Sequence, residues 1–145
     1  MIEKELDQIF RESFHTTIKL RSLWDSGVET IEIFKNPTKD EVLGLESIKQ
    51  YRECRVFLLP NEWYVASAIK VVHSQIMNAL PELRDAFGIT VRLEKNAPYA
   101  TVTASGDAPG LASGEIEFVK KHPFVNSLKS FGIKELRIQD QNVKL

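Results

Sequence analysis

Cysteine is almost absent from this sequence, which has only Cys54 among its 145 residues. A single cysteine excludes an internal disulfide and a cysteine-based zinc cluster. The three histidines, His15, His73 and His122, lie too far apart in sequence to show the spacing of a metal site. We therefore expect no metal ion and no other cofactor.

A surplus of charge and long apolar runs are also missing. Nineteen basic residues against twenty acidic ones give a net charge of −1, so nucleic-acid binding is expected only through a local basic patch. The apolar runs extend over a few residues, whereas a membrane-spanning helix needs about 20. The first residues, MIEKELDQIF, are charged and amphipathic, unlike a signal peptide. These features predict a cytoplasmic protein without membrane association.

Established catalytic motifs are absent as well. The sequence contains neither the G-x-S-x-G motif of serine hydrolases nor the H-E-x-x-H motif of zinc proteases. Cys54 also lacks a nearby motif that would supply a general base to activate it as a nucleophile. The glycines of residues 105–114 match neither the dinucleotide-binding nor the P-loop spacing, which predicts a mobile surface loop. Glu115 and Glu117 would share a face only on a strand, and no neighbouring residue suggests a hydrolase.

The most informative stretch runs from Cys54 to Leu80. Residues 55–59 and 62–66 are two apolar runs separated by the turn dipeptide Pro60-Asn61, which predicts a hairpin. From Ser67, a candidate N-cap, the apolar period becomes helical. The residues that would share the helical face are Ile69, Val72, His73, Ile76 and Leu80.

The preceding half of the chain shows three further patterns. Apolar residues at three- and four-residue steps predict an amphipathic helix from residue 2 to about residue 22. Residues 28–34 alternate as a strand with one apolar face. Thr38 and Glu41 match the capping box, which predicts a short helix over residues 39–47.

The following half predicts a second hairpin and two more helices. Residues 89–94 and 99–104 alternate as strands on either side of a turn at residues 96–98. Pro81 suits the start of a short helix over about 81–87, with Gly88 as its C-cap. The remaining expectations are a helix over residues 124–131, a strand over 134–139 and a tail over the last six residues.

Together these elements predict a single α+β domain over residues 1–145. Its sheet is expected to be mainly antiparallel and built from two hairpins. An N-terminal, a central and a C-terminal helix are expected to pack on this sheet.

His73 is the first candidate for a functional residue, because it is the polar exception on an apolar helical face. Imidazole titrates near neutral pH and can act as a general acid or base. Arg55 and Tyr64 come from the hairpin that leads into the same helix, so they could hold a phosphate and position a substrate. The alternatives are a histidine at the core edge bonded to backbone or tyrosine, and an arginine paired with Glu53 or Glu62.

Part of the chain, about residues 30–80, resembles small uncharacterised proteins of tailed phages and prophages. Their pattern is an "NP(S/T)" segment with a following Glu and Leu, an arginine strand, and a "YVWDA" segment with a later histidine. The matching residues are Asn36, Pro37, Thr38, Glu41, Leu43, Arg55, Tyr64, Val65, Ala68 and His73. Ala66 and Ser67 replace the Trp-Asp of that pattern. The resemblance implies a phage or prophage origin and adds weight to Arg55, Tyr64 and His73, without bringing an activity.

Three functions are compatible with these observations. The leading hypothesis is a protein-binding or regulatory module, because the charge is balanced, catalytic motifs are absent and the core accounts for most aromatics. The first alternative is a metal-independent nuclease or nucleotide-processing enzyme that uses His73, Arg55 and Tyr64, which requires these side chains to meet in an open cleft. The second alternative is a structural or assembly component of a virion, which would differ in its oligomeric state.

Overall fold

The computed structural model describes residues 15–23, 27–48, 53–68, 70–94, 96–105 and 109–145. Its eight strands form one sheet in the order β1-β2-β4-β3-β5-β6-β7-β8. Neighbouring strands are antiparallel except β6 and β7, which are parallel. The predicted α+β class with a mainly antiparallel sheet is therefore confirmed.

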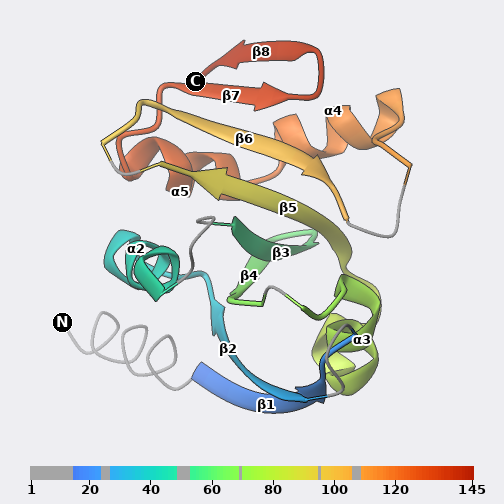
Figure 1. The fold of residues 1–145 in the computed structure, drawn as a ribbon. Coiled ribbons are helices and arrows are strands. Elements are labelled where there is room, and N and C mark those ends of the chain that lie inside the picture. Colours follow the sequence, from blue (N-terminus) through green and yellow to red (C-terminus); the bar gives the residue numbers. More distant parts are fainter. Residues whose placement is uncertain (1–14, 24–26, 49–52, 69, 95, 106–108) are drawn as a thin grey trace, which may run out of the picture.

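The elements follow one another along the chain as Figure 1 shows. The strands are β1 (His15–Arg21), β2 (Val28–Lys35), β3 (Glu53–Leu59), β4 (Glu62–Ala66), β5 (Phe87–Leu93), β6 (Tyr99–Ala104), β7 (Glu135–Ile138) and β8 (Gln141–Lys144). The helices are α2 (Lys39–Ile48), α3 (His73–Ala79), the 3-10 turn η1 (Pro81–Leu83), α4 (Ser113–Lys121) and α5 (Phe124–Ser130).

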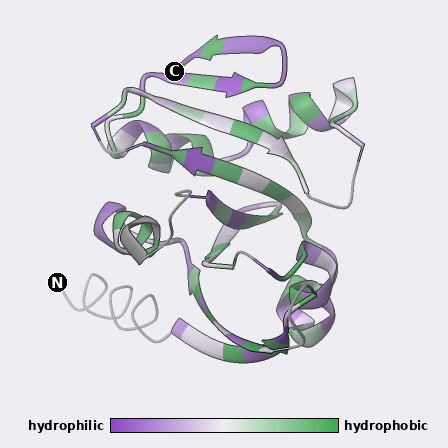
Figure 2. Ribbon diagram, in the orientation of Figure 1, coloured by the Kyte–Doolittle hydropathy of each residue, from purple (hydrophilic) through white to green (hydrophobic). Residues whose placement is uncertain are grey.

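Helices cover the two faces of the sheet unequally. Alternate residues of β3 belong to different clusters, with Val56 in a large core shared with α2, α4 and α5, and Phe57 in a smaller one shared with α3 and η1. Figure 1 shows α3 at the β1–β2 end of the sheet, and α4 and α5 beside β5 and β6. Figure 2 shows hydrophobic and hydrophilic residues alternating along β5, as expected for a strand covered on one face.

Several predicted elements agree with the structure. The strand at residues 28–34 is β2, and the two predicted hairpins are β3–β4 and β5–β6. The capping box of α2 is present, because the Thr38 N–H donates to Glu41 Oε1 at 2.7 Å and the Glu41 N–H donates to Thr38 Oγ1 at 3.3 Å. Local chemistry was sufficient for these elements.

The helix predicted from residue 2 to about 22 is wrong over residues 15–21, which form the edge strand β1. Exposed and half-buried residues alternate along β1, and Ile18 lies opposite Ile31 of β2. Two threonines beside Ile18 add β-branched side chains that favour a strand. Residues 2–14 of the predicted helix lie outside the described residues.

The central helix begins later than predicted, at His73 instead of just after Ser67. The Ser67 N–H donates to the Glu32 carbonyl at 3.3 Å, which continues the pairing of β4 with β2. Ser67 therefore continues the sheet instead of starting a helix. The N-cap is instead Val72, whose N–H donates to Gln75 Oε1 at 3.3 Å.

Two further boundaries differ from prediction. The helix predicted over 81–87 is limited to the turn η1, and Gly88 lies within β5 instead of ending a helix. The last residues form β8 instead of a tail, because Val143 lies opposite Leu136 and packs on the large core. Residues 116–119, for which no element was predicted, belong to α4.

Candidate functional site

Arg55, Tyr64 and His73 lie on the same face of the sheet, around Phe57. Tyr64 is directly opposite Phe57 in the β3–β4 register, and Arg55 is two residues from Phe57 on the same strand. The Phe57 and His73 ring centroids are 5.4 Å apart. The fold therefore brings the three predicted residues to one region, with an aromatic side chain in the middle.

His73 is a core residue, with only 2% of its surface exposed. Its Nε2 lies 2.7 Å from the carbonyl oxygen of Ile89, to which it donates a hydrogen bond. The ring rests on Gly88, where a Cβ atom would lie 2.9 Å from His73 Cδ2. A substrate has no access to this imidazole, so the open cleft that the nuclease hypothesis requires is not formed around His73.

Arg55 and Tyr64 each donate a hydrogen bond to another residue of the protein. Arg55 Nε donates to the Val71 carbonyl at 3.3 Å, and burial lowers the pKa of its guanidinium against the opposing effect of Glu53. The Tyr64 hydroxyl donates to Glu62 Oε2 at 3.3 Å. Burial, followed by the neighbouring Glu62 carboxylate, raises the pKa of Tyr64 to about 12. The Arg55 bond therefore ties β3 to the segment before α3, whereas the Tyr64 bond lies within β4.

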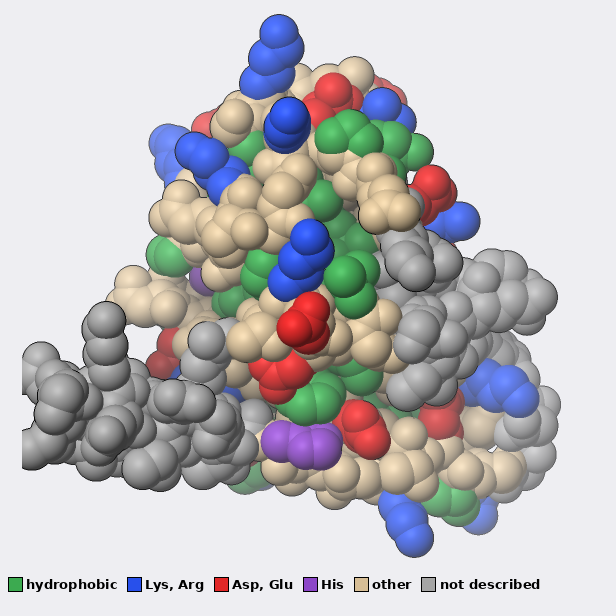
Figure 3. Space-filling model, turned by 90° about the vertical axis from the view of Figure 1, so that its left-hand side faces the viewer, with side chains coloured by type: hydrophobic (Ala, Val, Ile, Leu, Met, Phe, Trp, Pro, Cys, Tyr) green, Lys and Arg blue, Asp and Glu red, His purple; other side chains and the backbone are tan. Residues whose placement is uncertain are grey.

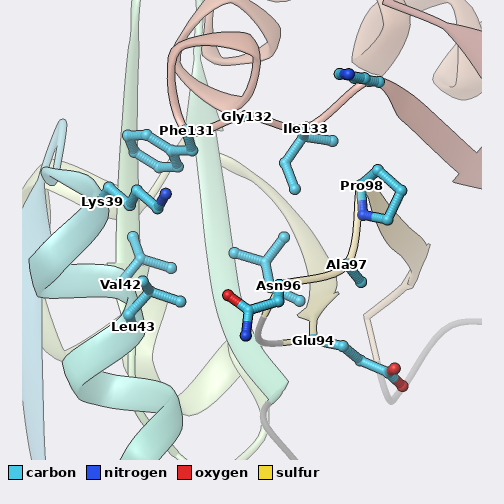
Figure 4. Close-up of a pocket in the computed structure, with 12 residues that line it drawn as sticks. Lys39, Val42, Leu43, Glu94, Asn96, Ala97, Pro98, Phe131, Gly132 and Ile133 are labelled. Carbon is cyan, nitrogen blue, oxygen red and sulfur yellow. The ribbon is translucent and has the colours of Figure 1, made fainter.

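A pocket of about 370 Å³ lies on the opposite side of the sheet, between α2, the turn after β5 and the turn after α5. Figure 4 shows its walls converging from these separate segments. The lining residues are Lys39, Val42, Leu43, Leu93, Glu94, Asn96, Ala97, Pro98, Phe131, Gly132, Ile133 and Lys134.

Backbone hydrogen bonds hold the two turns of the pocket together. The Lys134 N–H donates to the Pro98 carbonyl at 2.7 Å, and the Glu135 N–H donates to the same oxygen at 3.1 Å. Asn96 and Gly132 have φ angles of 67° and 96°, a region that asparagine and glycine tolerate best. The backbone course of the two turns that form this wall is therefore fixed.

The floor of the pocket is apolar. Val42, Leu93 and Ile133 are buried members of the large core and reach the pocket surface. The Phe131 ring forms one wall, and its centroid is 6.3 Å from that of Trp63. Figure 3, which views the molecule from the left-hand side of Figure 1, shows hydrophobic side chains in the middle of this face among charged side chains of both signs.

The rim of the pocket is polar. Figure 4 shows the Lys39 ammonium and the Asn96 amide directed into the pocket, whereas the Glu94 carboxylate points away from it. Glu94 Oε1 lies 3.9 Å from the Nε atom of Arg92, which is not among the described residues that line the pocket. The groups that face a bound molecule are consequently a cation and an amide above an apolar floor.

Sequence reasoning missed this pocket. The turn predicted at residues 96–98 was the one signal available. The pocket depends on the parallel pairing of β6 with β7, which places residues 131–134 beside residues 94–98. No local pattern in the sequence encodes that pairing.

The part of the chain that the structure describes shows neither a metal-ligand cluster nor a membrane-spanning helix. Within it, no three histidine, cysteine, aspartate or glutamate side chains gather as a metal site would require. None of the helices described there is long and apolar enough to cross a membrane. Comparisons of the chain with protein-family models, curated proteins and solved structures find no match.

Proposed function

We propose that this protein is a binding module that recognises a partner protein through the pocket between α2, the turn at residues 94–98 and the turn at residues 131–134. The observation that carries the proposal is the combination of an apolar floor with inward-directed polar groups in a pocket of about 370 Å³. Ligand sites are typically concave, mostly apolar and about 300–1,000 Å³ in volume.

The chemistry of the pocket favours binding over catalysis. The described residues that line it have lysine, glutamate and asparagine as their polar side chains, and they include no histidine, cysteine or tyrosine. A buried His73 bonded to Ile89 contributes to stability rather than to proton transfer. The proposal therefore does not assign a catalytic role to His73, Arg55 or Tyr64.

The cytoplasmic setting and the phage-like origin belong to this proposal as predictions from the sequence. A regulatory module and a virion component differ in assembly, and sedimentation of the purified protein distinguishes them. A small, defined oligomer supports the module, whereas large particles or open-ended polymers support the virion component.

The proposal is tested with indole, a neutral apolar probe, by isothermal titration calorimetry. We expect saturable binding that Leu43→Trp abolishes, because Leu43 is a half-buried lining residue and the larger ring would fill the pocket. The matched control is Lys121→Trp, which adds the same ring at an exposed site on α4. Indole binding that survives Leu43→Trp, or no indole binding at all, would contradict the proposal.

A further inference from the structure

We infer that the pocket recognises the C-terminal residue of a partner chain, with an apolar side chain on the floor and the terminal carboxylate between Lys39 and Asn96. This inference rests on the proposed function and specifies which part of a partner is bound. The two groups that it uses point into the pocket together in Figure 4.

Charge complementarity argues for an anionic ligand group. Among the described residues, the lining contains two lysines, Lys39 and Lys134, and one acidic residue, Glu94. The carboxylate is directed away from the pocket, and its Oε1 lies 3.9 Å from Arg92 Nε. A carboxylate entering the pocket thus meets the Lys39 ammonium, which is a donor to an anionic oxygen, beside the side-chain amide of Asn96.

The acidic residues next to Lys39 do not replace such a ligand. Glu41 Oε1 accepts hydrogen bonds from the Thr38 N–H at 2.7 Å and from the Thr38 hydroxyl at 2.9 Å. Asp40 is exposed in the first turn of α2 and is not part of the lining. The ammonium that points into the pocket therefore faces the apolar floor, with both neighbouring carboxylates outside the lining.

The position of the Lys39 ammonium next to the apolar floor argues that the ligand is the end of a chain. A C-terminal residue carries its side chain and its carboxylate on the same Cα atom, so both can enter one small pocket. An internal aspartate or glutamate would place a carboxylate there without an apolar group for Val42, Leu93 and Ile133. An internal leucine would fill the floor and leave Lys39 without an anionic partner. A leucine or a similar side chain at a chain end satisfies both requirements.

The test compares two peptides by isothermal titration calorimetry, acetyl-Ala-Ala-Leu with a terminal carboxylate and the same peptide with a terminal amide. We expect the carboxylate peptide to bind about tenfold more tightly, the effect of one charge-assisted hydrogen bond. Lys39→Met should remove that difference, because it should lower the affinity for the carboxylate peptide and leave the affinity for the amide peptide unchanged. The control Lys121→Met removes an exposed lysine of α4 and should leave the difference unchanged.

Each outcome has a definite meaning for the two proposals. Equal binding of both peptides, or a preference that Lys39→Met leaves intact, overturns the inference while the indole result still supports a binding pocket. Binding of 4-methylpentanoate as tight as that of the carboxylate peptide overturns the assignment to a chain end, because a small acid is then sufficient. If neither the peptides nor indole bind, the inference and the proposed function fail together.

Discussion

The Nε2 atom of His73 lies 2.7 Å from the carbonyl oxygen of Ile89, and the ring is in contact with Gly88. This relationship joins the first residue of α3 to the second and third residues of β5. An imidazole can approach the strand so closely because Gly88 has no side chain. His73 therefore fixes α3 on the sheet.

The first prediction concerns Gly88. Gly88→Ala places a Cβ atom 2.9 Å from His73 Cδ2, so the ring must move and its bond to Ile89 is weakened. We expect a loss of about 1–3 kcal/mol in the free energy of unfolding, measured by urea denaturation. Gly44→Ala is the matched control, since nothing lies within 4 Å of a Cβ atom there, and it should stabilise α2 by up to about 1 kcal/mol. Equal stability of Gly88→Ala and the unmodified protein would contradict this role of His73.

A second prediction separates stability from binding. His73→Ala removes a buried ring and its hydrogen bond, and we expect a loss of about 2–4 kcal/mol in unfolding free energy. Arg55→Ala should also be destabilising, through loss of the bond to the Val71 carbonyl. Both variants should retain indole binding under conditions in which they are folded, as judged by circular dichroism. Loss of indole binding in a folded His73→Ala protein would show that the two sides of the sheet are not independent.

Local patterns were sufficient for elements whose chemistry is contained within a few residues. The capping box of α2 and the turns of the two hairpins are of this kind. The edge strands β1 and β8 were missed because their formation depends on a neighbouring strand, β2 in one case and β7 in the other. Their short polar sequences resemble a helix face or a tail until that neighbour is known.

The sequence predicted less of the candidate site than of the fold. Arg55, Tyr64 and His73 lie on one face around Phe57, because a hairpin and the segment after it are close in the chain. Whether His73 is open or buried depends on Gly88 and Ile89 of a later strand. The pocket is built from three distant segments, so its existence followed only from the tertiary structure.

The third prediction is a pH dependence caused by His122. The ring is buried between α4 and α5, its Nδ1 accepts the Phe124 N–H at 3.0 Å, and its Nε2 donates to the Leu59 carbonyl. Burial lowers the pKa of His122, with the Leu59 bond opposing this effect. The unfolded chain consequently binds the proton more readily than the folded protein does.

The sign of this effect follows from linkage. The stabilisation is fully present above the unfolded pKa of about 6.5 and is lost as the pH falls from there toward the lower folded pKa. Urea denaturation between pH 7.5 and pH 5 should show this decline. His122→Asn should reduce the slope of stability against pH in that interval. An unchanged slope in His122→Asn would contradict the assignment.

The fourth prediction concerns the glycine-rich loop, which was expected to be mobile. The side-chain amide of Gln139 is bonded to the backbone of Leu111 in both directions, with Nε2 donating to the Leu111 carbonyl at 3.1 Å and Oε1 accepting the Leu111 N–H. Gln139→Ala should increase hydrogen exchange at Leu111 and lower stability by about 1–2 kcal/mol. Gln141→Ala, an exposed neighbour in β8, is the control. Unchanged exchange at Leu111 would mean that the loop does not depend on this pair.

The central claim is that the protein binds through the pocket and not around His73. The most direct test is an NMR titration of the isotope-labelled protein, first with indole and then with mononucleotides. We predict that indole shifts the signals of Val42, Leu93 and Ile133, and that mononucleotides leave the histidine signals unchanged. Shifts at Arg55, Tyr64 and His73 on adding mononucleotide, together with an unresponsive pocket, would contradict the account and favour the nuclease.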